Sequence, residues 1–165
     1  MAITLKRVCW DACAWIAMIQ VEKIVENGIE RYTRCRSVID QAKKGKIEVV
    51  CSGLCLAEVC KPKDVQDADP KKIADYFEHD YVMLVSLGRE IGERARNLMM
   101  VEKTGLYPQD ACHVATALMT PDVVELHTFD KDILKLDGKL NKADNTPLRI
   151  CLPDVGGSPI PLLGT

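Results

Sequence analysis

Short apolar runs alternate along the chain with stretches of helical periodicity. Five runs, several of them rich in β-branched residues, predict strands. These runs are Arg7–Trp10, Ile47–Cys51, Tyr81–Val85, Val123–Thr128 and, as an edge strand, Leu148–Cys151. Because most of the runs are short and apolar, they are typical of strands that are buried on both faces of a mostly parallel sheet.

Between these runs, apolar residues recur at the spacing of a helical face. The expected helices are Ala12–Val25, Ile29–Lys44, Leu54–Lys61, Lys71–Glu78, Arg89–Glu102, one that starts with Asp110 as its N-cap, and a short turn over Asp132–Leu136. We expect the polar stretch Lys63–Pro70 to be a surface loop. Strands that alternate with helices predict an α/β fold with three layers, α/β/α, around a central sheet of four to five strands.

Length and composition fit one globular domain. The chain has 165 residues, of which 47% are hydrophobic and 28% charged. We expect the domain to span residues 1–152 and residues 153–165, rich in Gly and Pro, to form an irregular tail. No apolar run approaches the roughly 20 residues that span a bilayer, and no secretory signal is evident. With a net charge of −2, nucleic-acid binding would have to depend on local basic patches.

The eight cysteines favour structural thiols in a reduced, cytoplasmic protein. No Cys-x-x-Cys pair occurs, which argues against a zinc ribbon or finger. Cys112 and His113 are adjacent on a predicted helix and therefore face different directions. This arrangement disfavours a Cys–His nucleophile.

Four acidic residues fall at comparable junctions. Asp11 and Asp130 directly follow strands, and Glu58 lies a turn or two beyond another strand. Asp110 follows Pro108 and opens a helix with small residues, which can pack closely against a sheet. In parallel α/β sheets the ligand site lies beyond the carboxyl ends of the strands. We therefore expect the four carboxylates to converge at one end of the sheet.

Converging carboxylates repel one another and contribute nothing to stability by themselves. A divalent cation reverses this repulsion, and a site made of carboxylate oxygens suits Mg²⁺ or Mn²⁺. One or two such ions activate water and neutralise charge on a phosphoryl group. The pattern therefore predicts metal-assisted hydrolysis of a phosphate ester without a serine or cysteine nucleophile.

The same residues resemble the PIN-domain family of metal-dependent ribonucleases. Asp11 matches the acid that ends the family's first strand, and Ala57-Glu58-Val59 is similar to its second acidic motif. The stretch Asp110–Ala117 resembles the third motif and Thr128-Phe129-Asp130-Lys131-Asp132 the fourth, with the order and spacing kept from residue 7 to about 151. The resemblance implies a parallel sheet flanked by helices and RNA cleavage with Mg²⁺ or Mn²⁺. Many members are VapC-like toxins with an antitoxin partner, and many form dimers.

The resemblance also implies roles for single residues. Asp11, Asp110 and Asp130 are expected as metal ligands, and Glu58 as a ligand, directly or through water, that orients the nucleophilic water. Thr128 either hydrogen-bonds an acid or is an ordinary strand residue, and Asp132 is either an auxiliary metal ligand or a first-turn acid.

The remaining candidates are basic or histidine side chains. We expect His113 to be structural, because neighbouring helical positions diverge, and His79 and His127 to be incidental. RNA phosphates would be met by basic residues. The candidates are Arg31, Arg34, Lys61, Lys63, Lys71 and Arg89.

One departure from the family pattern leaves an alternative open. Ala12 stands where many members carry Ser or Thr next to the first acid. The alternative to a nuclease is therefore a weak or inactive PIN-like scaffold that binds RNA or protein. An aspartyl phosphatase is disfavoured, because Asp11-Ala12-Cys13 lacks the second acid of an Asp-x-Asp motif.

Overall fold

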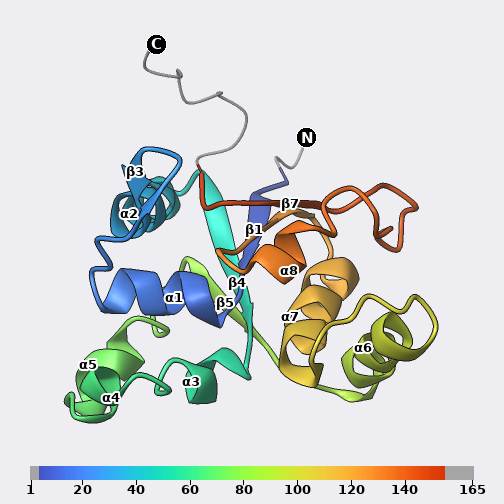
Figure 1. Cartoon of the computed structure of the whole chain (residues 1–165). Helices are drawn as coiled ribbons and strands as arrows, with labels where there is room; N and C mark the ends of the chain where they lie inside the picture. The colour runs from blue at the N-terminus through green and yellow to red at the C-terminus, as the bar shows by residue number, and fades with distance from the viewer. Residues whose placement is uncertain (1–3, 155–165) are drawn as a thin grey trace.

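The computed structural model describes residues 4–154 and contains a five-stranded parallel sheet between two layers of helices (Figure 1). The spatial order of the strands is β5-β4-β1-β6-β7, and every neighbouring pair is parallel. The strands are β1 (Lys6–Trp10), β4 (Ile47–Ser52), β5 (Val82–Val85), β6 (Val123–His127) and β7 (Arg149–Cys151). The predicted three-layer α/β/α class with a parallel sheet is confirmed.

Two apolar cores lie on the two faces of this sheet. On one face, Trp10 and Trp15 pack edge to face, with ring centroids 4.9 Å apart, among residues of α1 and α2. On the other face, Leu98 and Val114 belong to the core formed by α6 and α7. Figure 1 shows α1 and α2 on one side of the sheet and α6 and α7 on the other. Small residues of α7, among them Ala115, are fully buried there, so this helix packs close to the strands.

The helices largely follow the predicted periodicity. They are α1 (Ala12–Ile19), α2 (Arg31–Lys43), α3 (Cys55–Glu58), α4 (Lys63–Gln66), α5 (Pro70–Asp75), α6 (Arg89–Met100), α7 (Pro108–Met119) and α8 (Lys131–Leu134). Within the described residues, no helix is long and apolar enough to cross a membrane.

Two local predictions were wrong. The first helix ends at Ile19, and the chain then forms a small antiparallel hairpin from β2 (Val25–Glu26) and β3 (Ile29–Glu30). Asn27 and Gly28 turn this hairpin with φ of +49° and +80°, the conformation that an Asn-Gly turn favours. The expected surface loop over Lys63–Pro70 contains α4 and the first residue of α5. Of the tail predicted for residues 153–165, all but the first two residues lie outside the described part of the chain.

The sheet brings two of the four predicted acids to one edge. Trp10 and His127 are register partners at the carboxyl ends of the parallel strands β1 and β6. Asp11 and Thr128 are the next residues on these strands and therefore lie side by side. Asp130 follows two residues later, at the start of α8.

Candidate active site

Asp11 is buried at the N-terminus of α1, with only 3% of its surface exposed. As the N-cap it accepts the Ala14 backbone N–H on Oδ1 at 3.2 Å. The Cys13 thiol donates to the same oxygen at 2.9 Å, and the Thr128 hydroxyl donates to Oδ2 at 2.5 Å. Burial raises the pKa of Asp11, and these bonds, together with the nearby His113 imidazole, partly offset that rise. The carboxylate is therefore fixed in orientation before any ligand arrives.

Asp110 lies in the first turn of α7 and not at its N-cap. The helix starts at Pro108, with Tyr107 as N-cap, because proline is well suited to the first helical position. Asp110 is half-buried, and burial raises its pKa; the charges of Asp130, Asp11 and Glu58 raise it further. Three carboxylates that are far from Asp110 in sequence are thus close enough in space for their charges to act on it.

Glu58, at the end of α3, is buried and uses both carboxylate oxygens. Its Oε1 accepts the Lys61 ammonium at 2.8 Å, and its Oε2 is bonded to Nε2 of His113 on α7. Burial opposes ionisation, but the bonds from His113 and Lys61 outweigh it and lower the pKa of Glu58 to about 2. Glu58 is therefore ionised at neutral pH and held by His113 of α7 and by Lys61, which follows α3.

Asp130 is the N-cap of α8. Its Oδ1 accepts the backbone N–H groups of Asp132 at 2.8 Å and Ile133 at 3.3 Å, which leaves its second oxygen outside the cap. The Asp130 N–H donates to the Thr128 hydroxyl at 2.9 Å, and the same hydroxyl donates to Asp11. Thr128 thus links Asp11 and Asp130. Of the two interpretations of Thr128 from the sequence, the structure shows the one in which its hydroxyl bonds an acid.

Asp132 is exposed, unlike Asp11 and Glu58, which are buried. Within the described residues its carboxylate is exposed and pairs with Lys135 at 2.9 Å. Such exposed pairs contribute little to stability. Its backbone N–H, by contrast, serves the Asp130 cap.

Sequence reasoning missed Cys13 as a member of this site. Besides donating to Asp11, its sulfur accepts the Phe129 backbone N–H at 3.2 Å and lies 3.4 Å from the Thr128 hydroxyl. Burial first, and then the charge of Asp11, raise the pKa of Cys13, so the thiol stays protonated and can donate. Cys13, one residue after Ala12, thus supplies a side-chain donor to the first acid. The sequence does contain a signal for Cys13, because it lies two residues after Asp11, the N-cap of α1.

The contacts of His113 fit its interpretation as a structural residue. One of them positions Glu58, an acid of the candidate site. Its Nε2 bonds Glu58, and its Nδ1 lies 3.8 Å from the sulfur of Cys55. It does not pair with its neighbour Cys112, in line with the argument against a Cys–His nucleophile. All eight cysteines are free thiols.

The expectation that His127 is incidental was wrong. Its Nδ1 accepts the Trp10 indole N–H at 3.1 Å, and its Nε2 lies 2.8 Å from Glu125. Because an indole N–H only donates, Nδ1 carries no proton and Nε2 donates to Glu125. Arg149 bonds the other Glu125 oxygen at 2.9 Å, and Cys151 donates to Glu125 at 3.8 Å.

Glu125, His127 and Cys151 are close enough to suggest a metal site, since their ligand atoms lie within 4.8 Å of one another. Three facts favour a closed hydrogen-bond network instead. Arg149 already offsets the charge of Glu125. Burial, and then the charge of Glu125, raise the pKa of Cys151 to about 12, so its sulfur is a neutral thiol. Metal binding at Nε2 of His127 would need a proton on Nδ1, where the Trp10 N–H already points.

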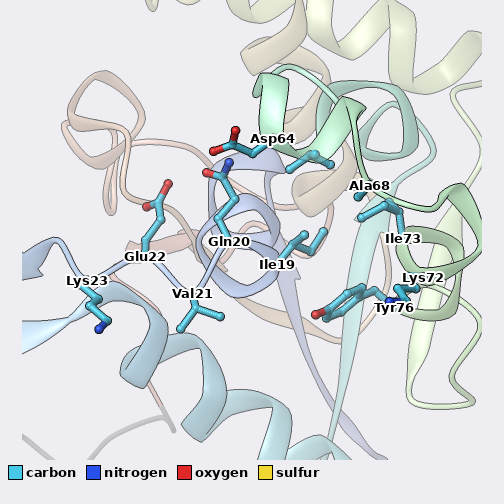
Figure 2. A pocket seen from close by; sticks show the side chains of 11 residues that line it. Ile19, Gln20, Val21, Glu22, Lys23, Asp64, Ala68, Lys72, Ile73 and Tyr76 are labelled. Atoms are coloured by element: carbon cyan, nitrogen blue, oxygen red, sulfur yellow. The ribbon is translucent and has the colours of Figure 1, made fainter.

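A pocket of about 550 Å³ lies away from the acids. Figure 2 shows side chains from the end of α1 and the following loop, such as Ile19 and Val21, together with Ile73 and Tyr76 of α5 and its C-cap. None of the four clustered acids lines this pocket. The pocket therefore takes no part in chemistry at the four carboxylates.

With this geometry in place, comparisons with known proteins point to one fold. No family model and no curated protein matches the chain. Among solved structures, the chain is similar to the crystal structure of VapC20 of Mycobacterium tuberculosis, a toxin that cleaves the sarcin-ricin loop. The similarity has a TM-score of 0.55 at 16% sequence identity and covers 76% of this chain and 91% of the other. The chain has the PIN-domain fold. Asp11, Glu58, Asp110 and Asp130 occupy the carboxyl-end side of the sheet in this PIN fold.

Proposed function

We propose that the chain is a metal-dependent endoribonuclease that hydrolyses RNA phosphodiester bonds at Asp11, Glu58, Asp110 and Asp130. The observation that carries the proposal is the placement of the acids at the carboxyl end of the sheet. Thr128 is hydrogen-bonded to both Asp11 and Asp130 there, and the charges of Asp130, Asp11 and Glu58 raise the pKa of Asp110 by repulsion. Such mutual repulsion costs stability, and a bound cation would relieve it. The PIN fold supports the same conclusion, since VapC20 is itself an RNA-cleaving toxin.

The donor set fits Mg²⁺ or Mn²⁺, as one ion or two, because every donor atom in the cluster is a carboxylate oxygen. Asp11, Asp110 and Asp130 would hold the metal, with Glu58 as a further ligand, directly or through water, and Asp132 as an auxiliary one at most. When bound, the metal supplies charge neutralisation at the phosphate and a more acidic water.

The protein's own part is to fix these oxygens. Thr128 and Cys13 hold Asp11, the α8 backbone holds Asp130, and His113 holds Glu58. Oxygens held in this way need little reorganisation when a charge develops at the phosphate. Glu58, ionised at neutral pH, is suited to orient the attacking water.

We further propose that residues 1–152 form the nuclease domain and that the protein acts in the cytoplasm. By analogy with VapC20, the role proposed is that of a toxin that an antitoxin protein restrains, and the protein would act as a homodimer or alone. The similarity to VapC20 supports the toxin role.

The experiment that tests the proposal is cleavage of a labelled RNA with Mn²⁺, with EDTA as the negative control. Asp110→Asn should abolish cleavage while the circular dichroism spectrum stays that of the wild type. Asp75→Asn is the matched control, because Asp75 is exposed at the end of α5 and is not one of the four proposed metal ligands. If Asp110→Asn cleaves as fast as the wild type, the assignment is wrong.

One observation favours the alternative of an inactive scaffold. Both oxygens of Glu58 are already bonded, to Lys61 and to His113, so a metal would have to compete for them. Calorimetry separates the two functions: a nuclease should release or absorb heat on binding Mn²⁺, whereas a scaffold should give no heat at millimolar metal.

A further inference from the structure

Lys61 places a positive charge at the rim of the acidic cluster. Its Nζ donates to Glu58 at 2.8 Å, while 64% of its side chain remains exposed. The bond to Glu58 raises the pKa of Lys61 most, and the charge of Asp110 raises it further. The ammonium is therefore close enough to interact with the charges of Glu58 on α3 and Asp110 on α7.

Holding Glu58 does not require this lysine. The buried His113 already bonds the other oxygen of Glu58, and this contact is shielded from solvent. The Lys61 ammonium is largely exposed, so solvent and salt screen its charge more than they screen the buried contact between His113 and Glu58. An ammonium also has three N–H donors, and its bond to Glu58 uses one of them.

The other basic candidates from the sequence are placed differently. Arg34 is buried and donates to the backbone oxygen of Glu26, and Arg31 is tied to Glu22 and Glu26. Arg89 pairs with Glu93 on the surface. Lys63 and Lys71 are exposed on other helices, and neither bonds an acid of the cluster within the described residues. Lys61 is thus the one of the six candidates that bonds a cluster acid.

We propose that Lys61 binds a phosphate oxygen of the RNA beside the scissile bond while its ammonium remains bonded to Glu58. This inference rests on the proposed function. It names a residue whose positive charge would offset the repulsion between the RNA phosphates and the four carboxylates. An exposed ammonium on a flexible stem can reach a phosphate without moving the buried acids. The same charge would repel a metal ion weakly, so Lys61 should favour substrate binding and not metal binding.

The test compares Lys61→Gln with Lys61→Arg, which keeps the charge. The control is Lys46→Gln, because Lys46 is exposed and precedes β4, at the opposite end of the sheet from the acids. Three quantities are measured for each variant: Mn²⁺ affinity without RNA, KM and kcat for cleavage, and the salt dependence of binding to a labelled single-stranded RNA in EDTA.

Lys61→Gln should raise KM about tenfold, the loss expected for one charge-assisted hydrogen bond. It should also reduce the slope of log affinity against log salt by about 0.7, the value for one phosphate contact on a single strand. Mn²⁺ affinity should stay equal or become tighter. Lys61→Arg keeps the charge and should therefore keep the salt slope, whatever its effect on KM. Lys46→Gln should behave as the wild type.

Two results would overturn the inference. Unchanged KM and salt slope in Lys61→Gln would make the lysine an ordinary surface ion pair. A tenfold weaker Mn²⁺ affinity with an unchanged slope would mean that Lys61 only supports Glu58. If the wild type neither cleaves RNA nor binds Mn²⁺, the proposed function fails, yet the salt slope in EDTA still decides the role of Lys61.

Discussion

Replacing Asp110 by Asn should make the metal-free protein more stable while removing its response to metal. In the fold, burial and the charges of Asp130, Asp11 and Glu58 raise the pKa of Asp110. An acid with a raised folded pKa carries its full stability penalty above that pKa, and the penalty fades as pH falls through it toward the unfolded pKa near 3.9. At pH 7 the neutral amide should therefore relieve repulsion that the ionised carboxylate imposes.

The magnitudes follow from the size of the domain. Substitution of a strained functional-site residue gains on the order of 1 kcal/mol, which for a domain of this length is a rise in Tm of about 2–4 °C. Metal at 100 times its Kd should stabilise the wild type by about 2.7 kcal/mol, equivalent to about 5–11 °C. Asp110→Asn should not show this stabilisation by metal.

The assay is thermal unfolding by circular dichroism, in EDTA and across a Mn²⁺ titration, for the wild type, Asp110→Asn and the control Asp75→Asn. In EDTA, the advantage of Asp110→Asn should shrink as pH falls from 7 toward 4. Two results together would refute the reasoning: an Asp110→Asn protein no more stable than the wild type without metal, and one still stabilised by Mn²⁺.

Three further changes test the network around the acids. Cys13→Ala removes the thiol from Asp11 and should lower kcat about tenfold, whereas Cys13→Ser should keep most of the rate; equal rates for both would show that the thiol does not matter. Trp10→Phe leaves Nδ1 of His127 without its donor and should cost about 1–3 kcal/mol in urea unfolding. Trp15→Phe should cost less, because the Trp15 N–H has no partner among the described residues, and the reverse order would contradict the assigned tautomer. The bond from His127 lowers the pKa of Glu125. The ionised Glu125 therefore stabilises the fold fully above its unfolded pKa, near 4.3, and this stabilisation is lost as pH falls through the lower folded pKa. Glu125→Gln should therefore differ most from the wild type at pH 6, and a difference that grows on acidification would be inconsistent with this.

The sequence predicted those parts of the fold that periodicity controls. Strands such as β1 and β6 are short and apolar, and their carboxyl ends place Asp11 and Asp130 without any knowledge of the tertiary structure. The β2–β3 hairpin was missed because its two-residue strands are too short for a pattern. The N-terminus of α7 was placed wrongly because an acid after a proline fits both an N-cap and the first turn.

The positions of the four acids could be inferred from the sequence, because Asp11 and Asp130 come just after strands and Asp110 lies in the first turn of a helix. Glu58 lies a short distance beyond a third strand, at the end of α3. Their partners depend on packing that the sequence does not encode locally. His113 reaches Glu58 across 55 positions, and Thr128 reaches Asp11 across 117. The bond between Glu58 and Lys61 is the exception, since a spacing of three residues at a helix end indicates such a pair.

The central claim is that the four acids share a metal ion, and a crystal structure of the wild-type protein grown with Mn²⁺ tests it most directly. We predict an anomalous peak about 2.0–2.2 Å from oxygens of Asp11, Asp110 and Asp130, with Glu58 at the same ion or one water away. A fully occupied crystal with no peak among these carboxylates, or with a peak only at Glu125, His127 and Cys151, would contradict the account.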